Sequence, residues 1–317
     1  MNVGLSTPVK LSTGKLKVGL FMNAMSNKYQ QVLSNAATQQ AKAYGWDLTT
    51  LDFNFDQQAM LNAMQNAVTN HTYNAWIVNP IDGVASCKML TQTAPAANII
   101  VVVTSTTVCG HDDDSVGNLW APGTYSYDSV STSADYFRVG LDAIGKANPG
   151  PQKVAILVGQ ADSGATIEWK SLAAEYEAKH PDFHVDGYIY TDYTAPTTYT
   201  MTQAYLQAHP DTTLVISIYS PDISEGMVRA VDSLNVGSHV KMADMGGAQY
   251  SVGEINAGVI QLTMPYYPAN MGANAVKSIR QAQEGATPVR VVDDVPGGWQ
   301  HAPVVTRANV GSFTPQY

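Results

Sequence analysis

Amide and aromatic side chains follow the first apolar stretch of the chain. Residues 15–22 are mostly apolar, and the segment 23–29 after them carries two amides, Asn23 and Asn27, and one aromatic ring, Tyr29. Planar amides can pair with hydroxyl groups, and an aromatic ring can pack against the C–H face of a small molecule. This combination indicates non-covalent binding of a polar ligand.

The sequence lacks the signatures of catalysis. It has no Gly-x-Ser-x-Gly segment, no His-Glu-x-x-His and no phosphate-binding loop that ends in Gly-Lys-Ser or Gly-Lys-Thr. Its seven histidines are scattered without the spacing of metal ligands. The run 112–114 is acidic, but it lacks the alternate acidic positions and the distal glutamate of a helix-loop-helix calcium site, which favours a solvated loop. We therefore expect no enzyme, no metal site and no cofactor.

The polar segment 23–29 lies between a strand pattern and a helix pattern. Apolar residues recur at intervals of three and four over 29–44, as in an amphipathic helix, and Gly45 can end that helix. Residues 46–51 then alternate as a strand does. A strand-helix-strand unit of this kind has parallel strands, and ligands bind beyond the carboxyl ends of such strands. The segment 23–29 would lie at that edge.

The rest of the chain repeats this alternation, which predicts an α/β fold. We expect strands at 75–79, 99–103, 154–158, 185–190, 214–218, 240–243 and 258–264, and helices at 57–70, 131–147, 166–180, 223–234 and 271–283. The strand at 99–103 is uniformly apolar, which is typical of sheets that helices cover on both faces. The second half repeats the architecture of the first, so the fold class is two similar doubly wound parallel-sheet lobes.

Bulk composition limits the partners. The chain has 317 residues, enough for two domains, and a net charge of −9, whereas a nucleic-acid partner would require a basic face. No apolar run is long enough for a transmembrane helix, and no signal peptide is visible. Residues 1–12 read as a flexible leader. The low charge and abundant small polar residues suit an exported protein.

The order and spacing of several segments resemble the type I periplasmic sugar-binding proteins, the ribose- and galactose-binding receptors of ABC transporters. The segments are 16–51, 77–82, 97–103, 209–216 and 303–310. The resemblance implies two lobes joined by three crossovers, with a ligand cleft between them. It places the lobes at 1–126 plus 267–292 and at 127–266 plus 293–317.

Within the first loop, the resemblance implies four ligand contacts. The polar contacts of the family fall on Asn23 and Asn27, and its stacking aromatics fall on Tyr29 and Gln30. Tyr29 keeps the aromatic type, and Gln30 departs from it.

Four positions that carry charge in the family are neutral in this chain. An Asp-Arg pair falls on Ser105 and Thr106, an arginine of the second lobe falls on or beside Trp169, and the aspartate of a Phe-Asp-Gly segment falls on Gly246. These departures imply a less charged and more aromatic cleft. They also imply a neutral ligand, since a buried ligand charge would demand a partner.

The remaining contacts fall at the ends of second-lobe strands. An asparagine of the family falls on Tyr219 or Ser220, Asp222 lies one residue out of register, Asp244 lies close to the position of the lost aspartate, and a crossover glutamine falls on Tyr266. Asp222 can equally cap the helix that begins there. For each aromatic residue the alternative is packing in the core.

The resemblance implies an extracytoplasmic, monomeric receptor that closes around a small neutral sugar or sugar alcohol and delivers it to an ABC permease. One alternative is the ligand-binding protein of a chemotaxis or quorum sensor. Another is the effector domain of a transcription repressor, which would need a helix-turn-helix before the core, where only about fifteen residues precede the first strand.

The two cysteines are expected to form a disulfide. Cys87 falls in the helix after residue 83 and Cys109 just past the strand 99–103, so both lie near the same carboxyl edge of a parallel sheet. Such a bond would suit an oxidising compartment. The alternative is two unpaired thiols.

Overall fold

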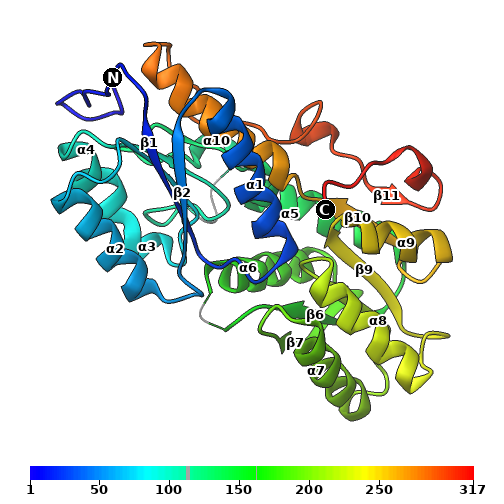
Figure 1. Ribbon diagram of the computed structural model, residues 1–317. Helices are drawn as coiled ribbons and strands as arrows, with labels where there is room; N and C mark the ends of the chain where they lie inside the picture. Colours follow the sequence, from blue (N-terminus) through cyan, green and yellow to red (C-terminus); the bar gives the residue numbers. More distant parts are fainter. Residues whose placement is uncertain (112–114, 162) are drawn as a thin grey trace. The chain divides into compact units, whose positions relative to one another are not determined.

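The chain divides into two units, each built around its own sheet (Figure 1). The computed structural model describes residues 1–111, 115–161 and 163–317. One unit contains Met1–Asp135 and Tyr267–Trp299, and the other contains Tyr136–Tyr266 and Gln300–Tyr317. The α/β class with two mainly parallel sheets, which the alternating pattern predicts, is confirmed.

The sheet of the first unit is entirely parallel, in the order β2-β1-β3-β4-β5. Its strands are β1 (Lys17–Met22), β2 (Asp47–Asp52), β3 (Ala75–Val78), β4 (Ile100–Val103) and β5 (Ser126–Tyr127). Every residue of β3 and β4 is buried, as expected of central strands with helices on both faces.

Helices cover both faces of this sheet. Helices α1 (Lys28–Ala43) and α10 (Pro268–Gln283) lie side by side although they are far apart in sequence (Figure 1). They can approach closely because Gly272 has no side chain. A Cβ at this position would collide with the carbonyl oxygen of Leu33. Against the other face pack α2 (Gln57–Thr69) and the segment α3 (Gly83–Lys88), a π-helical turn (Met89–Thr93) and α4 (Ala94–Ala96).

The sheet of the second unit has the order β11-β10-β9-β8-β6-β7, and only β11 is antiparallel. Its strands are β6 (Gln152–Val158), β7 (Phe183–Tyr190), β8 (Leu214–Ser217), β9 (Lys241–Gly246), β10 (Leu262–Pro265) and β11 (Val305–Thr306). A bulge interrupts the pairing of β6 with β7: Val154 pairs with Val185, but Ala155 pairs with Gly187. Asp186 is the extra residue, and bulges of this kind re-aim side chains.

Five helices accompany this second sheet. They are α5 (Ala134–Ala147, which begins in the first unit), α6 (Gly164–Lys179), α7 (Ala195–Ala208), α8 (Asp222–Leu234) and α9 (Gln249–Ala257). Helices α7, α8 and α9 enclose an apolar core with Ala155, Leu157 and Val215 of the sheet. Gly140 of α5 lies against Met245 and Met264 of β9 and β10.

The first residues of the chain are held against the first unit, so the expectation of a flexible leader is wrong. Val3 and Val9 are buried, and the amino group of Met1 donates to the carbonyl of Val9 at 2.7 Å. No helix among the described residues is long and apolar enough to cross a membrane.

The chain leaves the first unit for the second after Asp135, rather than at the expected residue 126. The physical reason is that Ser126–Tyr127 still pair with β4, and the N–H of Val292 donates to the carbonyl of Tyr127 at 2.8 Å. The last crossing follows Trp299 rather than residue 292. There the N–H of Trp299 donates to Asp293 at 2.8 Å.

Candidate functional site

The loop after β1 begins α1 through its own side chains. Oδ1 of Asn27 accepts the N–H of Gln30 at 3.0 Å and so caps the helix, and Oδ1 of Asn23 accepts the N–H of Ala24 at 2.7 Å. Asparagine is a favoured N-cap because its oxygen satisfies an otherwise unpaired backbone N–H. In both residues the side-chain oxygen accepts a backbone N–H from the next few residues of the chain.

Three hydroxyl groups from separate segments converge on the sulfur of Met271 in α10. Tyr29 Oη and Ser105 Oγ lie 3.3 Å from Sδ, and Ser129 Oγ lies 3.1 Å from it. Tyr29 Oη and Ser105 Oγ are also 3.3 Å apart. The structure thus brings together Tyr29 and Ser105, two expected contacts that are distant in sequence, at the carboxyl edge of the first sheet.

The backbone at Ser105 is held in a tight turn. Its φ is +60°, and the N–H of Thr106 donates to the carbonyl of Thr104 at 2.7 Å. The carbonyl of Ser105 accepts the hydroxyl of Tyr127 at 3.1 Å and that of Thr132 at 2.8 Å. A non-glycine residue at positive φ is retained only where its surroundings fix it.

A buried amide pair lies beside this cluster. Nδ2 of Asn79, which directly follows β3, donates to Oε1 of Gln30 at 2.9 Å. Both side chains are buried, and Oδ1 of Asn79 has no hydrogen-bond partner among the described residues. Because an unsatisfied buried acceptor is costly, this oxygen is a candidate to receive a ligand hydroxyl or a water.

In the second unit, aromatic rings form a continuous row. The centroids of successive rings are 4.9, 6.2, 5.8 and 5.4 Å apart. The row runs in the order Trp169, Phe137, Tyr266, Tyr219 and Tyr193. Trp169, Tyr266 and Tyr219 were expected contacts. Phe137 connects Trp169 to Tyr266, and Tyr266 contacts Tyr219 directly.

Trp169 and Tyr266 are almost fully buried, at 0% and 1% exposed. Tyr266 donates its hydroxyl to the carbonyl of Ile218 at 2.9 Å. Nε1 of Trp169 has no hydrogen-bond partner among the described residues, so one buried donor remains available. Tyr219 is only partly buried.

Two acidic residues of the second unit occupy different surroundings. Asp244 is fully buried, and its Oδ2 accepts the hydroxyl of Ser224 at 2.7 Å and that of Ser251. Burial raises the pKa of this carboxyl, while the hydroxyl donors oppose the rise. Asp222 is the first residue of α8, and Pro221 rather than Asp222 occupies the N-cap position. Asp222 still favours the helix through its charge in the first turn.

The turn after β9 is closed by the last residue of the sequence. Tyr317 donates its hydroxyl to the carbonyl of Gly246 at 3.0 Å, and its own carbonyl accepts the N–H of Gln249 at 2.6 Å. Oγ of Ser220 accepts the N–H of Ala248 at 3.1 Å. These contacts join the ends of β8 and β9 to residues 313–317.

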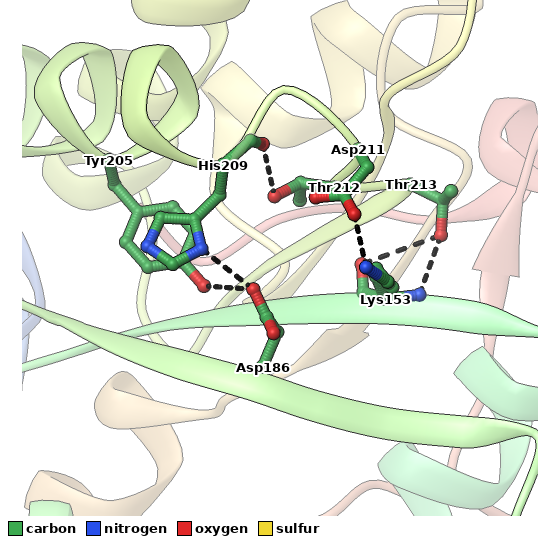
Figure 2. A network of polar contacts seen from close by, with 7 residues as sticks. All are labelled: Lys153, Asp186, Tyr205, His209, Asp211, Thr212 and Thr213. Atoms are coloured by element: carbon green, nitrogen blue, oxygen red, sulfur yellow. Dashed lines mark hydrogen bonds and ion pairs between the residues drawn. The ribbon is translucent and has the colours of Figure 1, made fainter.

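A separate polar network lies around the beginning of β6 and the loop before β8 (Figure 2). The rings of Tyr205 and His209 stack on each other. Oδ2 of Asp186, the residue at the bulge, accepts the hydroxyl of Tyr205 at 3.2 Å and lies 2.9 Å from Nδ1 of His209. Lys153 pairs with Asp211 in the same network. This arrangement fastens the end of α7 to the edge strand β7.

Two buried carboxyls lie on segments that lead from the first unit to the second. Asp128 precedes the crossing after Asp135, and Asp294 precedes the crossing after Trp299. Asp128 accepts the hydroxyl of Ser278 at 2.6 Å, and Asp294 accepts the N–H of Ser131 at 2.9 Å as well as its hydroxyl. Burial raises the pKa of Asp128 to about 7 and that of Asp294 to about 7, against the opposing effect of these hydrogen bonds.

The expected disulfide is confirmed. Cys87 of α3 and Cys109 are bonded, with Cα atoms 4.8 Å apart, and the bond closes the loop between the ends of β3 and β4. Among the described residues, no three His, Cys, Asp or Glu side chains are grouped so that they could hold a metal ion. The acidic run 112–114, weighed above as a calcium loop, lies outside the described residues.

The candidate site also includes residues that the sequence did not single out. They are Asn79, Ser129 and Met271 in the first unit, and Phe137, Tyr193 and Tyr317 in the second. Asn79 could have been found, because it is polar and directly follows an apolar strand. The other five are positioned by contacts between distant segments, for which the local sequence carries no signal.

Comparison with known proteins identifies the fold. Residues 18–287 match a family model described as a periplasmic binding protein domain. No curated protein sequence matches the chain.

Three solved structures illustrate the likeness in fold. An ABC transporter solute-binding protein from Mycobacterium smegmatis with bound glycerol is 23% identical, with a TM-score of 0.79 over 96% of this chain and 98% of that one. One from Bacillus halodurans with bound myo-inositol is 16% identical, with a TM-score of 0.81 over 96% and 99%. One from Actinobacillus succinogenes with bound D-allose is 20% identical, with a TM-score of 0.75 over 94% and 100%.

The family match covers most of the chain, and the topology of both units agrees with these structures. The resemblance drawn from the sequence is therefore confirmed, and the chain belongs to the periplasmic binding protein family, in its type I fold.

Proposed function

We propose that this protein is the solute-binding receptor of an ABC importer, and that it binds a small neutral sugar or sugar alcohol. The ligand is bound by side chains at the carboxyl edges of the two sheets, and the protein performs no chemical reaction on it. Binding of this kind needs hydrogen-bonding groups for several hydroxyls and apolar faces for the C–H surface of the ligand.

The observation that carries this proposal is that the candidate residues described at the two edges include no lysine or arginine. The first unit presents the hydroxyls of Tyr29 and Ser105 together with the amide pair of Gln30 and Asn79. An ionised ligand group placed there would be desolvated without an opposite charge, which is costly. Hydroxyl groups of a neutral ligand would instead find both donors and acceptors.

The second unit adds a row of aromatic rings, of which Trp169, Phe137 and Tyr266 are buried. The row from Trp169 to Tyr193 contains five rings, and Nε1 of Trp169 has no protein partner among the described residues. The solved structures of similar fold contain glycerol, myo-inositol or D-allose, all of which are neutral and polyhydroxylated. These ligands support a small neutral sugar or sugar alcohol as the class of ligand.

We also propose an extracytoplasmic location, a monomeric state and a membrane permease as partner. The disulfide between Cys87 and Cys109 supports an oxidising compartment. The structures of similar fold are described as ABC transporter components. Uptake of the ligand into vesicles that contain the permease, with and without this protein, tests the partnership.

A thermal-unfolding screen tests the ligand class. The compounds are glycerol, D-allose, myo-inositol and D-arabinose, with amino acids and organic acids as the comparison set. A ligand present at one hundred times its Kd should stabilise the protein by about 2.7 kcal/mol. We expect at least one neutral compound to raise the unfolding temperature and the comparison set to have no effect. Stabilisation by amino acids or organic acids alone would refute the proposal.

A further inference from the structure

Position 246 cannot carry a side chain in this fold. The φ of Gly246 is +127°, a region that favours glycine, and a Cβ there would overlap Oγ of Ser220 and lie 2.8 Å from Oη of Tyr317. The space beside the end of β9 is therefore occupied by groups from two other segments. A carboxylate attached at this position would displace both.

Tyr317 is fixed in that space at both of its ends. Its hydroxyl donates to the carbonyl of Gly246, and its backbone carbonyl accepts the N–H of Gln249 in the first turn of α9. Ala248, the N-cap residue of α9, has no side chain that could accept this N–H, so Tyr317 fulfils the capping role. Phe313 packs against the apolar core of the second unit and anchors the segment.

The hydroxyl of Tyr317 lies among residues that the sequence singled out as ligand contacts. Ser220 hydrogen-bonds to it, and Tyr219, Asp222 and Asp244 are close enough to act on its charge. Burial, the largest influence, raises the pKa of this phenol above its ordinary range. The group therefore stays protonated and neutral at physiological pH.

We propose that Tyr317 is a specificity-determining residue of the ligand site in the second unit, where its phenol replaces a side chain at position 246 and pairs with one hydroxyl of the ligand. This inference rests on the proposed function, because it assumes a polyhydroxylated ligand at this edge. Because its proton is donated to the carbonyl of Gly246, this phenol can only accept from a ligand hydroxyl, whereas a carboxylate could accept several hydrogen bonds and attract a cation. A phenol in place of a carboxylate therefore favours neutral ligands over cationic ones.

The substitution Tyr317→Phe tests the inference, because it removes the hydroxyl and leaves the ring and the backbone cap in place. The matched control is Tyr205→Phe, which removes the hydroxyl that donates to Asp186 in the network of Figure 2. Calorimetric titration measures the affinity of each protein for the neutral compound that binds the unsubstituted protein best among glycerol, D-allose, myo-inositol and D-arabinose. We expect Tyr317→Phe to weaken binding roughly fivefold and Tyr205→Phe to leave it unchanged.

Monodeoxy analogues of the same compound separate a direct contact from a structural effect. If Tyr317 pairs with one ligand hydroxyl, the analogue that lacks this hydroxyl should bind Tyr317→Phe and the unsubstituted protein equally, while the other analogues retain the fivefold difference. Equal affinity of the two proteins for the parent compound, or the same loss for every analogue, would overturn the inference alone. Failure of the unsubstituted protein to bind any of the four compounds would overturn the proposed function and the inference together.

Discussion

The hydroxyl of Tyr29 lies 3.3 Å from the sulfur of Met271, and both side chains are buried. Tyr29 lies in the first turn of α1, at the edge where the ligand is expected, whereas Met271 lies in the first turn of α10, just after the chain returns to the first unit. A thioether is a weak acceptor, yet two further hydroxyls point at it. The sulfur of Met271 thus contacts two candidate ligand residues, Tyr29 and Ser105, together with Ser129, which lies on the segment before the first crossing.

Met271→Leu should destabilise the protein more than an ordinary methionine-to-leucine exchange. The leucine retains the volume but deprives three hydroxyls of an acceptor. The control is Met64→Leu, at a buried position of α2 in the apolar core of the first unit. We expect the free energy of unfolding in denaturant to fall by about 1 kcal/mol more for Met271→Leu than for the control. Equal losses would mean that the sulfur contributes only its volume.

Substitutions of Asn27 should separate helix capping from ligand binding. Asn27→Ala should lower the free energy of unfolding by about 1 kcal/mol because α1 loses its cap, whereas Asn27→Ser should preserve it. If the amide also contacts the ligand, both variants should bind severalfold more weakly in calorimetry. A serine variant with unchanged affinity would show that Asn27 serves only the helix.

Strong local periodicity made much of the fold predictable. The segment 16–51 was expected as strand, helix and strand, and the structure has β1, α1 and β2 there, because the apolar spacing and the end at Gly45 both act within one element. The two-residue strand β5 was missed, because it is defined by pairing with β4 and not by a pattern of its own.

The site was less predictable than the fold for the same reason. Tyr29 could be proposed from the sequence because it follows an apolar strand and a polar segment, where a helix pattern begins. Tyr317 was missed because its place beside Gly246 depends on how residues 313–317 pack over a distant turn. Trp169 was expected as a cleft wall, and its full burial beside Phe137 depends on the packing of α5 against α6.

Reduction of the disulfide should destabilise the protein. Cys87 and Cys109 are 22 residues apart, and a closed loop of this length stabilises the fold by about 3 kcal/mol in the chain-entropy model. Denaturant unfolding with and without reductant measures the difference, and the double variant Cys87→Ser, Cys109→Ser should be insensitive to reductant. Two titratable thiols in the unfolded, unreduced protein would contradict the bond.

The stability of the protein should fall as the pH rises from about 4 to 7. In the folded protein Asp128 and Asp294 have pKa values of about 7, above the ordinary 3.8, so over this window the folded state binds more protons than the unfolded state. Each carboxyl should remove on the order of 1 kcal/mol per pH unit within the window.

Asp128→Asn tests the source of this pH dependence. The amide is neutral at every pH, and its oxygen can still accept the hydroxyl of Ser278. Unfolding free energies at pH 5 and pH 8 should therefore differ less in this variant than in the unsubstituted protein. An unchanged difference would exclude Asp128 as a contributor.

Calorimetric titration with a neutral sugar and its acid counterpart tests whether the protein selects neutral ligands. D-Allose and its uronic acid, which is oxidised at C6, are a suitable pair, because both form the same pyranose ring and differ chiefly in the carboxylate charge. Should another neutral sugar emerge from the thermal screen, it replaces D-allose in the pair. We expect saturable binding of the neutral sugar and binding of the acid at least about tenfold weaker, because the candidate residues described at the two edges include no cation to pair with a buried carboxylate. Tighter binding of the acid would contradict this expectation.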